Sequence, residues 1–366
     1  MVKKAEFVRI LVLLFTVLLC FSGCEKLKMP IIEEMDPLGA GIRETQPLTV
    51  MTYNVYLGSS TASVLDVEHL LQVPTEVANV YNNFVASDFP GRATAIAKSI
   101  KAHQPHLIGL QEMSLIRRQF PGDRITGGLI PAEEVVMDFR VVLLNALRSE
   151  GLEYRSAAEV ENIDVEMPMF AADGIVDVRL TDYDLILARS DVATSDPMGA
   201  NYINAFSVEM LGLKVKRGYA AVNATVDGIT YRFVNTHLES FSQEIRVAQT
   251  RELIDSLSKE TLPILLLGDF NTQAPDGVTY QLLIQAEYVD TWQTNVEGTG
   301  NTCYQDPNLR NEMSGHIKRI DQIFVSNSAS DVSVLMIQTL GDTPSDRLAS
   351  GLWPSDHAGV VAQLVF

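Results

Sequence analysis

The chain has 366 residues, of which 46% are hydrophobic and 20% charged, so it can bury a substantial core in one large domain or two ordinary ones. Its formal net charge of −18 disfavours diffuse binding to nucleic acid, because such binding depends on lysine and arginine side chains that neutralise phosphates. This charge does not exclude a polyanionic substrate that is approached through a bound metal ion.

The first 24 residues have the pattern of an export signal. Lys3, Lys4 and Arg9 precede an apolar run of about ten residues, which is too short to span a membrane. The small residues before Cys24 resemble the end of a bacterial lipoprotein signal, which implies removal of residues 1–23 and lipidation of Cys24. We expect an exported protein held to a membrane of the cell envelope by this lipid. An ordinary cleaved signal, and hence a secreted protein, is the alternative.

Residues 24–46 carry prolines, glycines and mixed charge, which predicts a lipidated N-terminus followed by a flexible tether. Residues 47–366 are expected to form the folded domain. If Cys20 leaves with the signal and Cys24 carries lipid, Cys303 has no partner for an intramolecular disulfide. We expect Cys303 to pack as a small apolar residue.

From residue 48 onward, strand and helix patterns alternate along the chain. Apolar β-rich runs predict strands at residues 48–53, 107–110, 183–188, 218–226, 231–237, 262–267, 320–325 and 359–366. Helical spacing predicts helices at residues 93–103, 135–147 and 242–258. Asp227-Gly228 suits a tight hairpin turn between two of the strands. Many strands with helices between them predict an α/β fold of two packed sheets with helices outside.

Short polar clusters follow or precede six of these apolar runs. They contain Asn54, Glu112, His237, Asp269 with Asn271, Asp321, and Asp356 with His357. Carboxylate and amide oxygens are the ligands that hard divalent cations prefer, and an imidazole transfers protons near neutral pH. This inventory suits the hydrolysis of a phosphate ester.

The order and strand-end placement of these clusters resemble the endonuclease/exonuclease/phosphatase superfamily, from about Leu48 to Phe366. The most specific pieces are Gly-Asp-Phe-Asn at 268–271 and Trp-Pro-Ser-Asp-His at 353–357. The resemblance implies a four-layer α-β-β-α sandwich of two packed mixed sheets with helices outside. It also implies phosphoester hydrolysis that depends on Mg²⁺, with Mn²⁺ as a substitute.

The resemblance also assigns roles to the ligands. Glu112 would be the principal magnesium ligand, Asn54 would hold the metal or the phosphate through its amide oxygen, and Asp356 would add a ligand. Many relatives carry an aspartate two residues after this asparagine, whereas this chain has Tyr56. This chain therefore lacks a carboxylate that would be a further metal ligand in those relatives, and water is the alternative ligand.

Proton transfer and phosphate binding would fall to the other positions. Asp269 would orient or deprotonate the attacking water, and Asn271 would steady the phosphate oxygens. His357 would be a general base or a phosphate contact oriented by Asp321. His237 would face the leaving group. For the Asn and Asp residues, the alternative is a role in a turn or a helix cap. For the histidines, the alternative is a structural role.

The remaining histidines, His69, His103, His106 and His316, lack such context and are interpreted as structural or surface residues. In the long segment after Glu112, Arg117 and Arg118 would meet a second phosphate or a head group. A solvated charge pair at the start of a helix is the alternative for them.

The leading hypothesis is a monomeric, lipid-anchored, magnesium-dependent hydrolase of a small phosphoester or a phospholipid head group. An exported nuclease with the same chemistry is the second hypothesis, and the acidic composition counts against it. The third is a non-catalytic lipoprotein that uses the same fold as a binding surface. Nucleic acid therefore remains an alternative partner rather than the favoured one.

Overall fold

The computed structural model describes residues 46–294, 298–326 and 332–366. The expected signal, the lipidation at Cys24 and nearly all of the expected tether lie outside these residues. The described part belongs to one compact unit that begins at Thr45. None of its helices is both long and apolar enough to cross a membrane.

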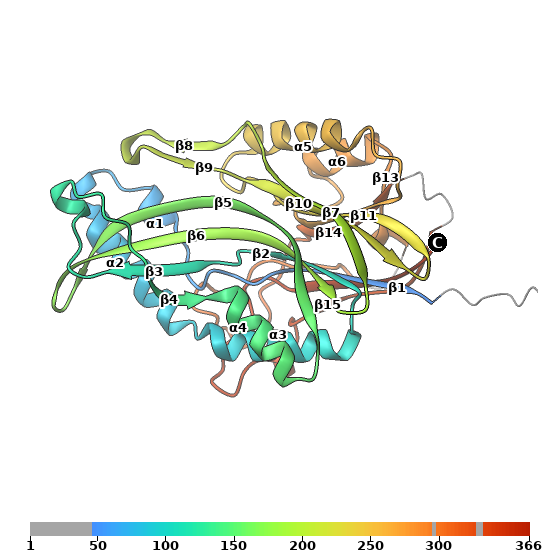
Figure 1. The fold of residues 1–366 in the computed structure, drawn as a ribbon, viewed down its shortest axis with the longest axis horizontal. Helices are drawn as coiled ribbons and strands as arrows, with labels where there is room; N and C mark the ends of the chain where they lie inside the picture. The colour runs from blue at the N-terminus through green and yellow to red at the C-terminus, as the bar shows by residue number, and fades with distance from the viewer. Residues whose placement is uncertain (1–45, 295–297, 327–331) are drawn as a thin grey trace, which may run out of the picture. The chain divides into compact units, whose positions relative to one another are not determined.

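Two mixed sheets form the centre of the fold (Figure 1). The eight-stranded sheet contains, in spatial order, β15 (Ser333–Leu340), β16 (Gly359–Val365), β1 (Leu48–Asn54), β2 (Leu107–Gln111), β6 (Gly174–Arg189), β3 (Leu115–Gln119) and β4 (Glu134–Asp138), and β5 (Tyr154–Ala171) pairs with β6. The six-stranded sheet contains β13 (Tyr288–Asp290), β14 (Asp321–Ser326), β12 (Ile264–Asp269), β11 (Ile229–His237), β10 (Gly218–Val226) and β7 (Ala193–Asn201).

Helices cover the outer face of each sheet, which gives the four layers that the resemblance implied. The helices are α1 (Ala62–Leu65), α2 (Val73–Ala86), α3 (Phe89–His103), α4 (Phe139–Ser149), α5 (Gln243–Leu257) and α6 (Val278–Gln285). In Figure 1, α3 and α4 lie below the eight-stranded sheet, and α5 and α6 lie above the six-stranded sheet. The prediction of an α-β-β-α sandwich is confirmed.

The alternation of side chains along β1 shows how one strand serves two apolar cores. Leu48 and Val50 face the other sheet, whereas Met51 and Tyr53 face the helices. Because successive side chains on a strand point to opposite faces, a strand buried on both sides is apolar throughout. All seven residues of β1 are buried, which makes Asn54, at its end, a rigidly placed polar group.

The helix expected at residues 135–147 begins later than predicted. Residues 134–138 form β4 against β3, and the Asp138 side chain then caps α4 by accepting a hydrogen bond from Val141 N at 3.1 Å. The valines of this stretch fit a strand as well as a helix, so tertiary pairing decided the outcome. By contrast, the helix expected at residues 242–258 is found as α5, and Ser242 caps it with an Oγ that accepts from Ile245 N.

The β5–β6 hairpin extends well beyond the sandwich and was largely missed. Only residues 183–188 were predicted as a strand, whereas β5 and β6 span 18 and 16 residues. Two β-bulges in β5, near Ser156 and Glu161, break the period of two that marks a strand in sequence. A short third sheet of β8 (Phe206–Val208) and β9 (Leu213–Val215), joined by the 3₁₀ turn η3 (Glu209–Leu211), lies at the same end (Figure 1).

Candidate active site

All six polar clusters of the sequence meet at one edge of the sandwich. β1 and β2 run parallel, as do β11 and β12, so that Asn54, Glu112, His237 and Asp269 come to the same end. β14 runs antiparallel to β12 and places Asp321 opposite Asp269. β16 runs antiparallel to β1, so the residues just before it return to this edge.

The site straddles the two sheets, and a buried polar contact fixes their alignment below it. Gln111 Nε2 donates to Asn235 Oδ1 at 2.6 Å and to Thr52 Oγ1 at 3.1 Å. Asn235 Nδ2 donates in turn to the carbonyls of Leu110 and Leu185 across the gap between the sheets. At Gly109, a Cβ would lie 2.6 Å from Asn235 Oδ1, so only glycine allows this approach.

His357 and Asp321 form the most closely held pair of the site. His357 Nδ1 lies 2.8 Å from Asp321 Oδ2, and both side chains are buried. The Ser355 hydroxyl donates to Asn54 O and accepts from His357 N, which ties this segment to the end of β1. Burial alone opposes a charge on the ring, but the Asp321 and Asp356 carboxylates raise the pKa of His357 well above its usual value.

Asp269 stands between the two histidines. Its Oδ2 lies 3.4 Å from His237 Nε2 and 3.9 Å from His357 Nε2, and accepts from Asn54 Nδ2 at 3.2 Å. Its Oδ1 accepts from Asn271 N at 2.9 Å. A carboxylate held at this point between two imidazoles is placed to exchange a proton with either ring or with a water between them.

His237 is contacted by two residues that were not predicted from the sequence. Arg217 Nη1 lies 3.1 Å from His237 Nδ1, and Asp184 Oδ1 lies 3.7 Å from the same atom. Because a guanidinium only donates, Nδ1 of the neutral ring accepts and Nε2 carries the hydrogen toward Asp269. Burial and Arg217 oppose protonation, but Asp184 and Asp269 raise the pKa of His237 above its usual value.

Glu112 and Asn54 are linked at the ends of neighbouring strands. Glu112 Oε1 accepts from Asn54 Nδ2 at 3.1 Å, and its Oε2 accepts from Leu57 N at 2.7 Å. Asn54 Oδ1 accepts from Tyr56 N, so the oxygen expected to face a metal holds the backbone. Glu112 adopts a left-handed backbone with a φ of 59°, which is uncommon outside glycine and typical of functional positions.

Asp356 and Asn271 complete the set of predicted residues. Both line the cavity described below. Asn271 Nδ2 donates to Leu238 O at 2.9 Å, which directs its amide toward the backbone of the neighbouring loop. Burial and the Glu112 carboxylate raise the pKa of Asp356 to about 7, although His357 acts in the opposite direction.

Tyr56 does not replace a carboxylate ligand. Its hydroxyl donates to Pro307 O at 3.0 Å, and its ring packs with Leu309, Leu352 and Trp353. The Tyr56 carbonyl is one of four that accept from the buried guanidinium of Arg92. Tyr56 therefore supports the loop after β1 rather than the metal shell.

The donor set at this edge fits a hard divalent cation. Asp269, Asp321 and His357 each offer a ligand atom, and these atoms lie within 4.8 Å of one another. The Oδ1 atoms of Asp321 and Asp356 are buried without a hydrogen-bond partner in the described part of the chain. Buried oxygens that lack a proton donor, gathered beside other carboxylates, are what Mg²⁺ or Mn²⁺ would satisfy.

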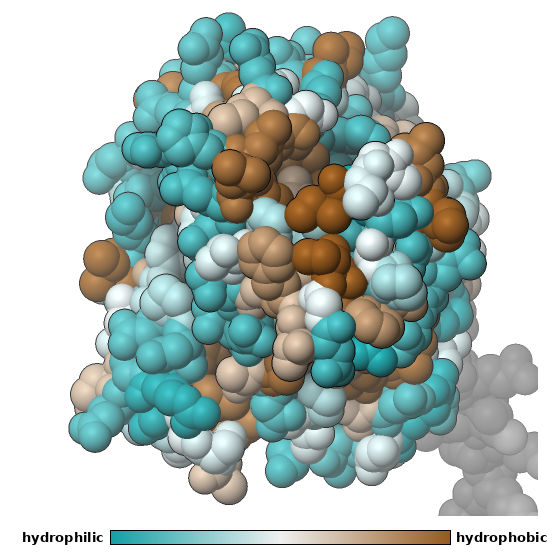
Figure 2. Space-filling model, turned by 90° about the vertical axis from the view of Figure 1, so that its left-hand side faces the viewer, coloured by the Kyte–Doolittle hydropathy of each residue, from teal (hydrophilic) through white to brown (hydrophobic). Residues whose placement is uncertain are grey.

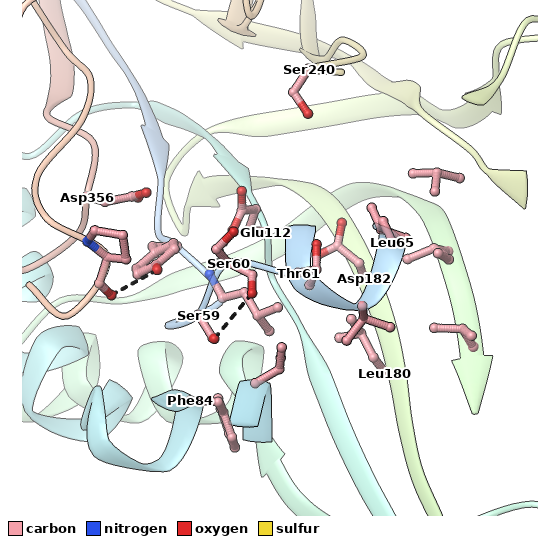
Figure 3. Close-up of a pocket in the computed structure, with 18 of the residues that line it drawn as sticks. Ser59, Ser60, Thr61, Leu65, Phe84, Glu112, Leu180, Asp182, Ser240 and Asp356 are labelled. Atoms are coloured by element: carbon pink, nitrogen blue, oxygen red, sulfur yellow. Dashed lines mark hydrogen bonds between the residues drawn. The ribbon is translucent and has the colours of Figure 1, made fainter. Parts of the chain in front are cut away.

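A cavity of about 600 Å³ opens from this cluster. Its polar end is lined by the predicted residues Glu112, His237, Asp269, Asn271, Asp356 and His357. In Figure 3, Asp356 and Glu112 lie at one side, Leu65 and Leu180 at the other, and Asp182 between them. Its size is typical of sites that enclose small-molecule ligands, which cover ~300–1,000 Å³.

Asp182, Asp184 and Asn162 form a buried network that sequence reasoning missed. Asn162 Nδ2 donates to Asp184 Oδ2 at 2.7 Å, and Ser114 Oγ donates to Asp182 Oδ1 at 3.1 Å. Burial and the neighbouring Asp184 and Glu112 raise the pKa of Asp182 to about 7. Two aspartates spaced by two in an apolar strand share one face, and that spacing was the available signal.

The arginines after Glu112 are taken up within the sheet. Arg117 contacts Thr181 and lies 3.4 Å from Asp164, and Arg118 pairs with Glu134 at 2.7 Å. Both lie on β3, so the alternative of a pair at a helix start is wrong. Neither lines the cavity. Their guanidiniums contact side chains of neighbouring strands rather than the cluster that would hold a phosphate.

The other histidines and Cys303 have structural contacts. His106 Nδ1 accepts from Thr49 N, and His316 Nε2 contacts Asp356 O at 3.2 Å. Burial lowers the pKa of His316 to about 4, which keeps this ring neutral. Cys303 is a free thiol that is fully buried, and burial raises its pKa.

Residues 51–357 match the Endonuclease/Exonuclease/phosphatase family over most of the chain. The chain belongs to this family. Members of this family are metal-dependent phosphoester hydrolases. A search of curated protein sequences gives no match.

Solved structures of the same fold are distant in sequence. A family member from Bacteroides thetaiotaomicron has a TM-score of 0.55 and 18% identity, covering 88% of this chain and 96% of that one. A mannosyl-6-phosphatase from Bacteroides thetaiotaomicron VPI-5482 has a TM-score of 0.54 and 17% identity, covering 87% and 100%. A humanised D. rerio TDP2 has a TM-score of 0.51 and 17% identity, covering 87% and 99%.

Proposed function

We propose that this family member hydrolyses phosphoester bonds with a divalent cation, Mg²⁺ or Mn²⁺, and acts on a small phosphoester or a phospholipid head group. The observation that carries this proposal is the buried row Asp321–His357–Asp269–His237, in which the last three side chains line the polar end of one cavity. Two imidazoles flanking a carboxylate supply the proton transfers that an ester hydrolysis requires.

Each residue then has a distinct part in the reaction. Asp269 orients the attacking water and accepts its proton. Asp321 holds the Nδ1 side of His357, so Nε2 of that ring contacts a phosphate oxygen beside Asp269. His237, with its Nε2 hydrogen directed into the cluster, stabilises or protonates the leaving oxygen.

Glu112, Asn54 and Asp356 are the residues that the resemblance assigns to the cation. Asp269, Asp321 and His357 offer ligand atoms that lie within 4.8 Å of one another. A divalent cation, when bound, neutralises charge on the phosphate oxygens and positions the phosphate. Asn271 keeps its proposed part as a neighbour of the phosphate, with its amide fixed to Leu238 O.

A colorimetric phosphodiester assay with purified protein tests this proposal. Bis(4-nitrophenyl) phosphate should be hydrolysed with Mg²⁺ or Mn²⁺, and excess chelator should abolish the activity. Glu112→Ala should reduce turnover by about 10²-fold or more, because it removes a cation ligand. Hydrolysis that persists in chelator, or a Glu112→Ala protein with undiminished turnover, would contradict the proposal.

A nuclease is the competing activity, and the composition of the cavity argues against it. Arg217 is the one Lys or Arg among the described lining residues, and it already bonds His237. Strand binding would need a row of such cations. Plasmid nicking that requires Mg²⁺ would favour the nuclease. If every phosphoester tested stayed intact, the non-catalytic alternative would gain support.

We also propose that the protein is an exported, monomeric lipoprotein attached to a membrane of the cell envelope through Cys24. The support is the signal-like sequence before that residue. Cys24→Ala should move the protein from the membrane fraction to the soluble fraction, whereas Cys303→Ala should leave it in place. Membrane attachment that survives Cys24→Ala would overturn this assignment.

A further inference from the structure

The far end of the cavity is apolar and is built by α2, the β5–β6 hairpin and β9. Helix α2 contributes Val77 and Phe84, the β5–β6 hairpin contributes Val165, Met167 and Leu180, and β9 contributes Leu213. Val77 and Met167 belong to a separate apolar cluster in which α1 and α2 pack on the hairpin. The hairpin and the two helices therefore form a wall of their own beside the catalytic edge.

The polar and apolar ends are parts of one continuous cavity. Glu112, Asp269 and His357 line it together with Val77 and Leu180. Figure 3 shows the change of character along it, from Asp356 and Glu112 past Asp182 to Leu180 and Leu65. A ligand whose phosphoester is at the polar end must extend its remaining part along this apolar wall or out of the cavity.

The outer face at this end also carries apolar side chains around a hollow (Figure 2). Large apolar residues are exposed on the two connectors beside the cavity walls. Leu70 and Leu71 of η1 (Leu70–Gln72) are 58% and 89% exposed, and Met210 of η3 is 42% exposed. Phe241, which lines the cavity, is 49% exposed. Apolar patches that surround a concave site mark the contact region of an apolar ligand.

We propose that the substrate is an amphiphile whose phosphoester lies at Asp269 and His357 while one hydrocarbon chain occupies the apolar end of this cavity. The inference rests on the proposed hydrolase function and specifies its substrate class. A hydrocarbon chain suits the site because burying methylenes is favourable by about 0.8 kcal/mol each, which converts to about fourfold. Sugars or nucleotides would leave their polar groups unpaired against Val77, Phe84 and Leu180.

A series of 4-nitrophenyl alkyl phosphates tests the inference, with methyl, butyl, hexyl and octyl chains below their critical micelle concentrations. In every member, water attacks phosphorus, the P–O bond to nitrophenol breaks, and alkyl phosphate and nitrophenol are released. We expect kcat/KM to rise by about fourfold per methylene until the chain fills the apolar end. Equal kcat/KM across the series would overturn the inference and leave the hydrolase function standing.

A variant that fills the apolar end of the cavity tests the same inference. Val77→Trp should bring the octyl substrate down to the kcat/KM of the methyl substrate and leave the methyl substrate unchanged. Val85→Trp is the control, because Val85 lies on the same helix, is 57% exposed and does not line the cavity. An unchanged preference for octyl in a folded Val77→Trp protein would contradict the inference.

Leu180→Ala tests the same wall if the tryptophan variant does not fold. It enlarges the apolar end, so the chain length with the highest kcat/KM should increase. If the chain length with the highest kcat/KM stays the same, the hydrocarbon chain does not lie against this wall.

If none of the 4-nitrophenyl alkyl phosphates is hydrolysed, the proposed hydrolase function is wrong. Binding of a hydrocarbon chain can then be tested separately by calorimetry. Octyl phosphate should then bind tighter than butyl phosphate by about 10²-fold, with a negative heat-capacity change. Equal affinities for the two alkyl phosphates would overturn it.

Discussion

The two ends of the cavity are built by different physical means. At the polar end, most functional side chains lie at or next to the end of a buried strand and are fixed by directional bonds, as the His357 ring is by Asp321. At the apolar end, α2 and the β5–β6 hairpin present Val77, Met167 and Leu180 to the cavity, and these side chains are held by apolar packing rather than by hydrogen bonds. The difference suggests that reaction and substrate choice can change separately, because loops and hairpins vary on a rigid scaffold.

The largest effect is expected at the polar end, from removing His357. His357→Ala should lower kcat by about 10²–10⁴-fold while the protein stays folded, because a positioned imidazole supplies that much in proton transfer. Steady-state kinetics with the methyl substrate measures the loss, and circular dichroism monitors the fold. His103→Ala is the control, since His103 lies at the end of α3 and does not line the cavity. Equal activity of the two variants would remove His357 from the reaction.

Arg92 tests whether the polar end depends on buried support. Its guanidinium donates to the carbonyls of Val55, Tyr56, Ser87 and Pro354, which joins the loop after β1 to the segment before Asp356. Arg92→Met should lower the free energy of unfolding by about 3 kcal/mol, because several carbonyls lose their donor. Urea denaturation measures this change. A loss below ~1 kcal/mol would mean that water replaces the guanidinium.

At the apolar end, a volume-conserving substitution should have little effect on stability or turnover. Leu180→Met conserves volume and should cost less than ~1.5 kcal/mol of unfolding free energy, with unchanged turnover of the methyl substrate. Urea denaturation and the same kinetic assay measure both quantities. A large loss of turnover would show that this wall also positions the reacting groups and would end the distinction between the two regions.

The smallest effect concerns Asp182, which lies between the two ends. Burial raises its pKa to about 7, so the folded protein binds more protons than the unfolded chain between pH ~4 and 7. The metal-free protein should therefore become more stable as the pH falls, by about 1 kcal/mol for this group between pH 8 and 6.5. Asp182→Asn should reduce that pH dependence by this amount in urea titrations. An identical dependence in both proteins would contradict the burial argument.

The sequence was most informative where a strand ends in a polar group. Asn54, His237 and Asp269 each follow an apolar run, and the order of the motifs predicted both the sandwich and the edge at which they meet. The pairing of His357 with Asp321 was also predicted, although only the fold brings the two within 2.8 Å.

The rest depended on contacts between distant segments, which a single sequence does not show. Arg217 has no motif around it and reaches His237 only because β10 pairs with β11. The β5–β6 hairpin was missed because bulges interrupt its alternation and charged residues such as Asp164 and Arg179 neutralise each other across it. Without the hairpin, neither Asp182 nor the apolar wall could be inferred.

The contact between Gln111 and Asn235 sets the spacing of the two sheets beneath the candidate active site. One sheet carries Asn54, Glu112 and His357, while the other carries His237, Asp269 and Asp321, so the reacting atoms keep their separation only if the layers do not slide. Gly109→Ala would push a methyl group against Asn235 and act as a wedge at that point. Such a protein would fold and keep all of its ligand atoms, but the atoms from one sheet would be displaced relative to those from the other.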